Sequence, residues 1–136
     1  DVCYCSPLAR ARQTAVIFLK DRNIPIITDE RLIEMSFGIY EGTEQSARAL
    51  DCPINILFEE PEKYKAVEGG ESIEELFERT GDFLRNVVEP QLEAGKNIVI
   101  IGHGAMNSGI ICQVRGLSTE HFWDAGINQC ELLQLK

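Results

Sequence analysis

The 136-residue sequence is 44% hydrophobic and 26% charged, as is typical of a soluble globular domain, so we expect a single domain over residues 1–136. Its formal net charge of -9 would repel nucleic acid and anionic membrane surfaces, which argues against both as partners. No stretch approaches the roughly 20 consecutive apolar residues of a membrane span, and no signal-peptide pattern opens the chain.

Cysteine and histidine usage predicts neither disulfides nor a metal centre. The five cysteines are odd in number and contain no C-x-x-C pair, which favours reduced thiols and a cytoplasmic protein. The two histidines and the scattered carboxylates lack ligand spacing, so we expect no metal and no cofactor.

The first residues predict a strand followed by a helix. Residues 2–5 are a short apolar run that ends at Ser6-Pro7, with Ser6 as the expected N-cap and Pro7 at the first helical position. Apolar residues then recur at helical spacing as far as residue 19. Residues 24–28 predict a second short strand, which Pro25 assigns to a sheet edge or to the strand's first residues.

The middle of the chain has no steady period. Residues 30–42 are punctuated by Gly38 and Gly42 and predict a loop rich in potential contacts, which could be functional. Residues 43–68 mix short helical patches with two prolines, which indicates an irregular helical excursion over one edge of the sheet.

The second half carries the clearest local signals. Ser72 and Glu75 form the capping box of an amphipathic helix that we expect to end before Pro90. Residues 98–101 are β-branched without polar alternation, which predicts a central, parallel strand covered on both faces. A helix should follow and end near Gly116, and residues 131–136 predict a closing edge strand.

Two residues stand where an anion would bind. His103 follows the buried strand, and ligands of open α/β sheets bind outside the carboxyl ends of strands, although a lone histidine there is as often structural. Arg10 lies in the first turn of a helix, where the macrodipole favours acidic residues. It therefore either covers a neighbour with its stem or meets an anion together with the helix end. Arg12 should point elsewhere, as a solvated charge.

Four segments, in this order, resemble the signatures of histidine phosphatases of the phosphoglycerate-mutase-like superfamily. Residues 6–15, with Arg10, are similar to the second signature, and residues 32–42, with Glu34, to the acid loop. Gly69-Gly70-Glu71-Ser72, with Arg79 after it, is similar to the third motif, and Gly102-His103-Gly104 to the second-histidine motif. The resemblance covers essentially the whole chain.

This resemblance implies a three-layer α/β/α sandwich with a mainly parallel sheet and an active site at the carboxyl ends of its strands. It also implies hydrolysis of a small phosphorylated metabolite through a phosphohistidine intermediate. Arg10 and His103 would clamp the phosphoryl oxygens, and Glu34 would be the general acid. Gly104, Phe37 and Tyr40 are the further residues expected to bind substrate.

Other residues have simpler explanations. The capping box accounts for Ser72 and Glu75 without a ligand, so we interpret the third motif as mainly structural. His121 has no motif around it and is expected to be a surface or lid residue. Tyr64 and Trp123 are aromatic candidates for lining the pocket around the rest of the substrate.

The chain departs from the family pattern at its start. The family opens with a strand that ends in Arg-His-Gly, and neither His103 nor His121 has such a setting. We therefore expect this chain to be the carboxyl-terminal portion of a domain whose first βα unit carries the nucleophile. A phosphoglycerate-mutase-type activity and an inactive phosphate-binding module are the alternatives. The short excursion at residues 43–68 favours hydrolysis over the mutase, and nothing in the sequence indicates the oligomeric state.

We predict that the 136-residue chain, expressed alone, hydrolyses p-nitrophenyl phosphate no faster than buffer, because the group that should accept the phosphoryl is not in it. Release of p-nitrophenolate is the measurement. Turnover that disappears in His121→Gln would contradict this prediction, because it would make His121 the nucleophile.

Overall fold

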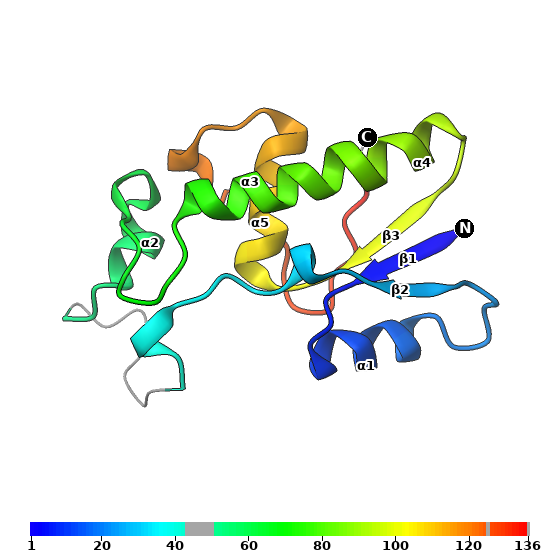
Figure 1. Ribbon diagram of the computed structural model, residues 1–136, viewed down its shortest axis with the longest axis horizontal. Helices are drawn as coiled ribbons and strands as arrows, with labels where there is room; N and C mark the ends of the chain where they lie inside the picture. Colours follow the sequence, from blue (N-terminus) through cyan, green and yellow to red (C-terminus); the bar gives the residue numbers. More distant parts are fainter. Residues whose placement is uncertain (43–50, 125, 136) are drawn as a thin grey trace.

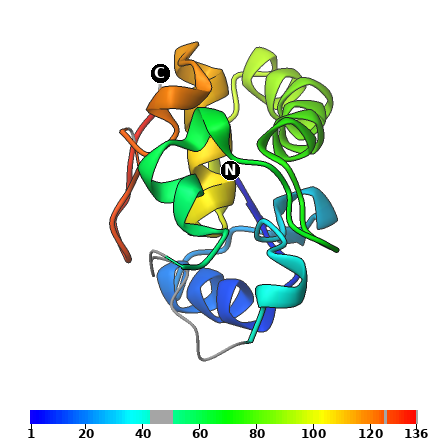
Figure 2. The ribbon, with the colours of Figure 1, turned by 90° about the vertical axis from the view of Figure 1, so that its left-hand side faces the viewer.

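In the part of the chain that the structure describes, three parallel strands form the sheet. The computed structural model describes residues 1–42, 51–124 and 126–135. The strands are β1 (Val2–Cys5), β2 (Ile26–Thr28) and β3 (Ile98–Ile101), in the order β2-β1-β3. Helix α1 (Ala9–Phe18) covers one face, and α3 (Ile73–Phe83) and α5 (Gly104–Arg115) cover the other (Figures 1 and 2). The predicted three-layer α/β/α arrangement is confirmed. No helix in this described part is long and apolar enough to cross a membrane.

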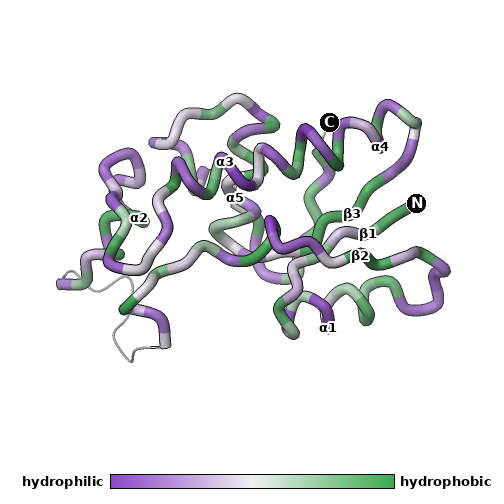
Figure 3. The backbone as a smooth tube through the Cα atoms, in the orientation of Figure 1, coloured by the Kyte–Doolittle hydropathy of each residue, from purple (hydrophilic) through white to green (hydrophobic). Residues whose placement is uncertain are grey.

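Strand β1 is the centre of the sheet because it pairs with β2 on one side and with β3 on the other, and both of its faces are covered. Cys3 and Cys5 pack with Ala15 and Leu19 toward α1. Val2 and Tyr4 alternate with them and belong to the larger core on the other side. All four strand residues are buried, and the strands are among the most hydrophobic segments of the chain (Figure 3).

The predictions for β3 and for the last residues are wrong in part. β3 is parallel, but β1 is its only neighbour in the described residues, and its side chains are only partly buried. A run of hydrophobic residues indicates that apolar groups cover both faces of a strand. It does not indicate whether the strand lies at the centre or at the edge of the sheet. Residues 131–135 form no strand, and residue 136 lies outside the described residues. Their alternation is weak, and Glu131 instead closes a turn by accepting hydrogen bonds from Asn128.

Helix α1 begins two residues later than the sequence predicts. Leu8 is its N-cap and makes no side-chain cap, so Ser6 is not the N-cap and Pro7 lies outside the helix. The Ser6 N–H donates to Ile101 O over 3.0 Å, which keeps Ser6 at the end of the sheet. Its hydroxyl accepts a hydrogen bond from the Leu8 N–H over 3.3 Å.

The helix that begins with α3 starts where the sequence predicts, but it extends further than predicted. The capping box is present, with the Glu75 N–H donating to Ser72 Oγ and the Ser72 N–H donating to the Glu75 carboxylate. The helix continues through a π segment, η4 (Leu84–Val88), into α4 (Glu89–Glu93), so Pro90 lies inside it. The wider π turn just before Pro90 accommodates its ring and its missing N–H. Helix α5 ends as predicted, with Gly116 in the left-handed conformation.

The loop after β2 is fixed by two short 3-10 helices, η1 (Glu30–Leu32) and η2 (Gly38–Tyr40). Gly38 has φ 53° and lies so close to the backbone of residues 68–70 that a Cβ would be 2.0 Å from Glu68 O. The excursion contains α2 (Asn55–Glu59) and η3 (Pro61–Lys63). α2 lies beyond the carboxyl ends of the strands, not over a lateral edge (Figure 1). Residues 43–50 of the predicted excursion lie outside the described residues.

Two arginines attach this loop to α3. The Arg31 guanidinium donates to both Asp29 oxygens over 2.9 and 2.7 Å and to Asp82 over 2.6 Å. Arg79 donates to both Glu71 oxygens over 2.6 and 2.9 Å, and its third contact is to Arg31 O over 2.6 Å. Paired forks of this kind fix orientation as well as distance. The loop is therefore held at residue 31, three residues before Glu34.

We predict that Asp29→Asn lowers the free energy of unfolding by about 1 kcal/mol at neutral pH, because it removes a charged partner of Arg31. The hydrogen bonds from Arg31 hold the pKa of Asp29 below its ordinary value. The stabilisation is therefore complete above about pH 3.9, the carboxyl pKa in an unfolded chain, and is lost as the pH falls through the lower folded value.

Urea unfolding of both proteins across this pH range is the measurement. Asp51→Asn is the matched control, since it removes the same charge at an exposed position. A stability difference between the wild type and Asp29→Asn that stays constant down to about pH 3 would contradict the assignment.

Candidate active site

The ends of the three strands meet at one edge of the sheet. Cys5 is paired with Thr28 on one side and with Ile101 on the other. The backbone bonds continue one residue further, because the Ser6 N–H donates to Ile101 O and the Asp29 N–H donates to Cys5 O, each over 3.0 Å. Residues that follow β1, β2 and β3 are thus neighbours in space, as parallel strand ends should be.

His103 lies at this edge as the N-cap residue of α5 and is 8% exposed. Its Nε2 is 2.8 Å from Ser6 Oγ, which is fully buried. Burial lowers the pKa of His103, the Glu34 carboxylate opposes this, and the charges of Arg10 and Arg79 lower it further. The neutral imidazole is therefore favoured when no anion is bound.

Glu34 occupies the amino-terminal end of α5. Its Oε1 accepts hydrogen bonds from the Met106 N–H over 3.0 Å and from the Met35 N–H over 2.8 Å. Its Oε2 accepts one from the Ala105 N–H over 3.3 Å. A carboxylate is stabilised there, since the free N–H groups and the macrodipole both favour negative charge. The structure thus brings Glu34 and His103, 69 residues apart in sequence, to the same helix end.

Arg10 and Gly104 complete the set of candidate polar contacts. Arg10 is exposed in the first turn of α1, which contains no acidic residue, and its charge reaches His103 strongly enough to lower the pKa of that imidazole. Gly104 is exposed at the start of α5, and a Cβ there would lie 3.9 Å from Glu34 Oε2. Arg12 instead lines a separate cavity beside Val16 and Ile26, so it does point elsewhere.

Phe37 and Tyr40 lie in the same loop as Glu34 but are half-buried against the larger core. Phe37 also forms an isolated antiparallel bridge with Gly70. Both rings therefore contribute to the packing of the core, independently of any contact with a substrate. Tyr64 is buried, which does not support the expectation that it lines a pocket.

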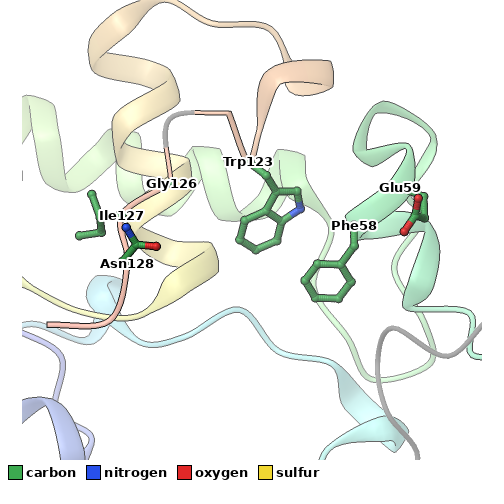
Figure 4. A pocket seen from close by; sticks show the side chains of 6 residues that line it. All are labelled: Phe58, Glu59, Trp123, Gly126, Ile127 and Asn128. Carbon is green, nitrogen blue, oxygen red and sulfur yellow. The ribbon is translucent and has the colours of Figure 1, made fainter. Parts of the chain in front are cut away.

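An open cavity of about 420 Å³ lies between the excursion and the carboxyl-terminal segment (Figure 4). The Trp123 and Phe58 rings stack at 5.2 Å between centroids, and the Trp123 indole N–H donates to Leu57 O over 2.7 Å. Ile127 and Asn128 line the cavity on the side away from Phe58. Of the aromatic candidates, Trp123 alone is in this lining.

The remaining histidine is on the surface. His121 lies in η5 (Thr119–His121), is 48% exposed in its side chain, and has its Nδ1 2.6 Å from Asp124. The hydrogen bond to Asp124 raises the pKa of His121, which favours imidazolium over a nucleophilic neutral ring. The expectation of a surface residue is consistent with this position.

Two residues that help to build the site were not identified from the sequence. Ser6 was predicted as a helix cap, and its contact with His103 depends on β1 lying next to β3, which no local pattern reveals. The Arg31–Asp82 pair joins residues 51 positions apart and has no periodic signature. A signal for Ser6 did exist, because a small polar residue that ends a strand is a candidate ligand contact in any parallel sheet.

Comparisons with known proteins agree with this architecture. The family model of the histidine phosphatase superfamily (branch 1) matches residues 1–136. Phosphoserine phosphatase 1 of Hydrogenobacter thermophilus is 28% identical over 128 residues, which cover 93% of this chain and 59% of that protein. A 2,3-bisphosphoglycerate-dependent phosphoglycerate mutase of Cytophaga hutchinsonii is 29% identical over 123 residues, which cover 88% and 58%.

The fold is shared with solved structures. Bacillus stearothermophilus YhfR superposes with a TM-score of 0.77 at 27% identity, covering 90% of this chain and 60% of that one. The chain spans between 58% and 66% of the length of the first curated relatives that it matches. The match over all 136 residues, together with the shared fold, shows that the chain belongs to the histidine phosphatase superfamily (branch 1).

Proposed function

We propose that this chain is the larger part of a phosphomonoesterase that cleaves a small phosphorylated metabolite through a phosphohistidine intermediate. The observation that supports this most directly is the meeting of His103 and Glu34 at the amino-terminal end of α5, with the Arg10 charge nearby. Phosphoryl transfer needs positive donors around the phosphoryl oxygens and a proton for the leaving alkoxide. His103 and Arg10 would supply the first, and Glu34 the second.

The nucleophile belongs to a segment outside these 136 residues. Neither histidine follows the family's Arg-His-Gly pattern, and His121 is exposed and paired with Asp124. β3 has one strand neighbour in the described residues, so its other edge can accept a further strand. A parallel strand there would end beside His103, which is where an attacking imidazole is needed.

Glu34 has to leave part of its resting position to act. The carboxylate now accepts three N–H groups, two of them from the first turn of α5. A phosphoryl group at the same helix end would compete for those donors, because both are anions that favour the positive end of the helix. Glu34 would then turn toward the leaving oxygen, and in the second half-reaction it would deprotonate the attacking water.

Hydrolysis is favoured over mutase activity by the short excursion. Relatives at similar identity include both a phosphoserine phosphatase and a phosphoglycerate mutase, so identity alone does not separate the two activities. Members that return the phosphoryl to a second oxygen usually carry a longer insertion between the acid loop and the third motif. A small phosphorylated metabolite is the proposed substrate class. The five free cysteines support a reducing compartment such as the cytoplasm.

We predict that Arg10→Ala weakens inorganic phosphate binding by roughly 1.5 to 3 kcal/mol in the complete protein, the usual scale of a hydrogen bond to a charged group. Calorimetric titration is the measurement. Arg12→Ala is the matched control, because it removes an equal charge from the same helix on a side that lines another cavity. Equal losses in both variants would reduce the role of Arg10 to long-range attraction.

We also predict that Glu34→Gln in the complete protein slows hydrolysis of an alkyl phosphate by about 10² to 10⁴, the range of general acid catalysis. p-Nitrophenolate leaves readily without a proton, so phosphorylation of the enzyme by p-nitrophenyl phosphate should be much less impaired. Phosphohistidine should then accumulate, because its hydrolysis still lacks a base.

Rapid-quench measurement of the two half-reactions separates these effects. Glu41→Gln is the control, since Glu41 lies in the same loop and accepts a hydrogen bond from the Phe37 N–H instead. If Glu34→Gln slows phosphorylation equally for both leaving groups, Glu34 is not the acid.

A further inference from the structure

Ser6 and His103 form a short contact between their side chains inside the candidate site. Ser6 Oγ is 2.8 Å from His103 Nε2, and Ser6 is fully buried. The two side chains are 97 residues apart and meet because β1 and β3 are neighbours. A contact of this length between a hydroxyl and an imidazole nitrogen is a hydrogen bond whose direction depends on which partner carries the hydrogen.

The hydrogen-bond inventory of Ser6 decides the direction. A serine hydroxyl has one hydrogen to donate and two lone pairs to accept with. The Leu8 N–H already donates to this oxygen over 3.3 Å. Within the described part of the chain, Nε2 of His103 is the acceptor that the structure gives the hydroxyl hydrogen. If Nε2 carried a hydrogen instead, the Ser6 hydrogen would be buried without an acceptor, which is unfavourable.

We infer that the Ser6 hydroxyl donates to Nε2 of His103 and thereby fixes the neutral imidazole as the tautomer that carries its hydrogen on Nδ1. Nδ1 has no partner among the described residues and is the nitrogen left to donate to an anion. Ser6 is on this view a positioning residue that acts through His103. The inference rests on the proposed function, because it concerns how the same site holds a phosphoryl group.

The chemical consequence is that His103 donates without being charged. With its hydrogen on Nδ1, a neutral ring offers an N–H to a phosphoryl oxygen, whereas the other tautomer would present a lone pair to it. The neutral ring is the form that burial and the Arg10 and Arg79 charges favour, with Glu34 as the opposing charge. Ser6 therefore lets the site bind an anion at pH values where the imidazole is not protonated.

Long-range ¹H–¹⁵N correlation spectra of the ligand-free protein test this directly. Near pH 8 we expect His103 to show a protonated, pyrrole-type Nδ1 and a pyridine-type Nε2. Its signals are those that disappear in His103→Gln. In Ser6→Ala the Nε2–H tautomer should become populated, and Ser6→Thr, which keeps the hydroxyl, should restore the wild-type pattern. Ser108→Ala is the control, because it removes another buried hydroxyl from the neighbouring α5.

Phosphate binding gives a second readout. Ser6→Ala should weaken inorganic phosphate binding about tenfold near pH 8 relative to the wild type. The difference should shrink as the pH falls and the imidazolium donates from both nitrogens. Loss of affinity by the same factor at every pH would indicate a merely structural role and would overturn the inference.

The two proposals fail in different ways. A wild-type His103 that carries its hydrogen on Nε2, or a tautomer unchanged in Ser6→Ala, overturns the role of Ser6 whatever the protein does with phosphate. An Nδ1–H tautomer that depends on Ser6, in a complete protein that neither binds phosphate nor turns over a phosphomonoester, confirms the Ser6 contact and rejects the proposed function. Because the spectra need no ligand, the wild-type measurement decides the inference even if Ser6→Ala does not fold.

Discussion

The parallel register of β1 against β3 is the constraint on which the candidate site depends. Cys5 pairs with Ile101, and the next backbone bond joins Ser6 to Ile101. That alignment brings the start of the chain to the start of α5, almost a hundred residues later, and sets Ser6 against His103. A shift of register by one residue would turn the side chains of β1 to the opposite faces and separate the pair.

Electrostatic interactions then determine which charged groups lie at the amino-terminal end of α5. The chain as a whole is strongly negative, so an anionic ligand needs local donors to be held at all. The free N–H groups of α5 and the Arg10 charge provide them, and Glu34 rests among them as an internal anion. In the proposed function, the same field that holds Glu34 would favour a phosphoryl group in its place. Phosphoryl binding and the release of Glu34 would then be linked through shared N–H donors.

The irregular loop that carries Glu34 is stabilised by contacts with other segments of the chain. Residues 30–42 contain only two 3-10 turns, which supply few internal hydrogen bonds. Arg31 and Arg79 attach the loop to the flank of α3, and the close approach of Gly38 to residues 68–70 attaches its far end. The third motif, with Glu71 paired to Arg79, thus has a structural role that reaches the acid loop.

The sequence alone determined the elements with strong local chemistry. The capping box and Gly116 act through neighbouring backbone, and both predictions are confirmed. The β-branched run at residues 98–101 forms a parallel strand, as predicted, but not the central one in the described residues. The order of the four motifs likewise identified the family. What only the tertiary structure decided depends on non-local contacts: the rank of β3, the π turn that carries the helix past Pro90, and the partner of Ser6. Local patterns record which faces are apolar and where turns occur, whereas which strand ends become neighbours is set by the packing of the whole sheet.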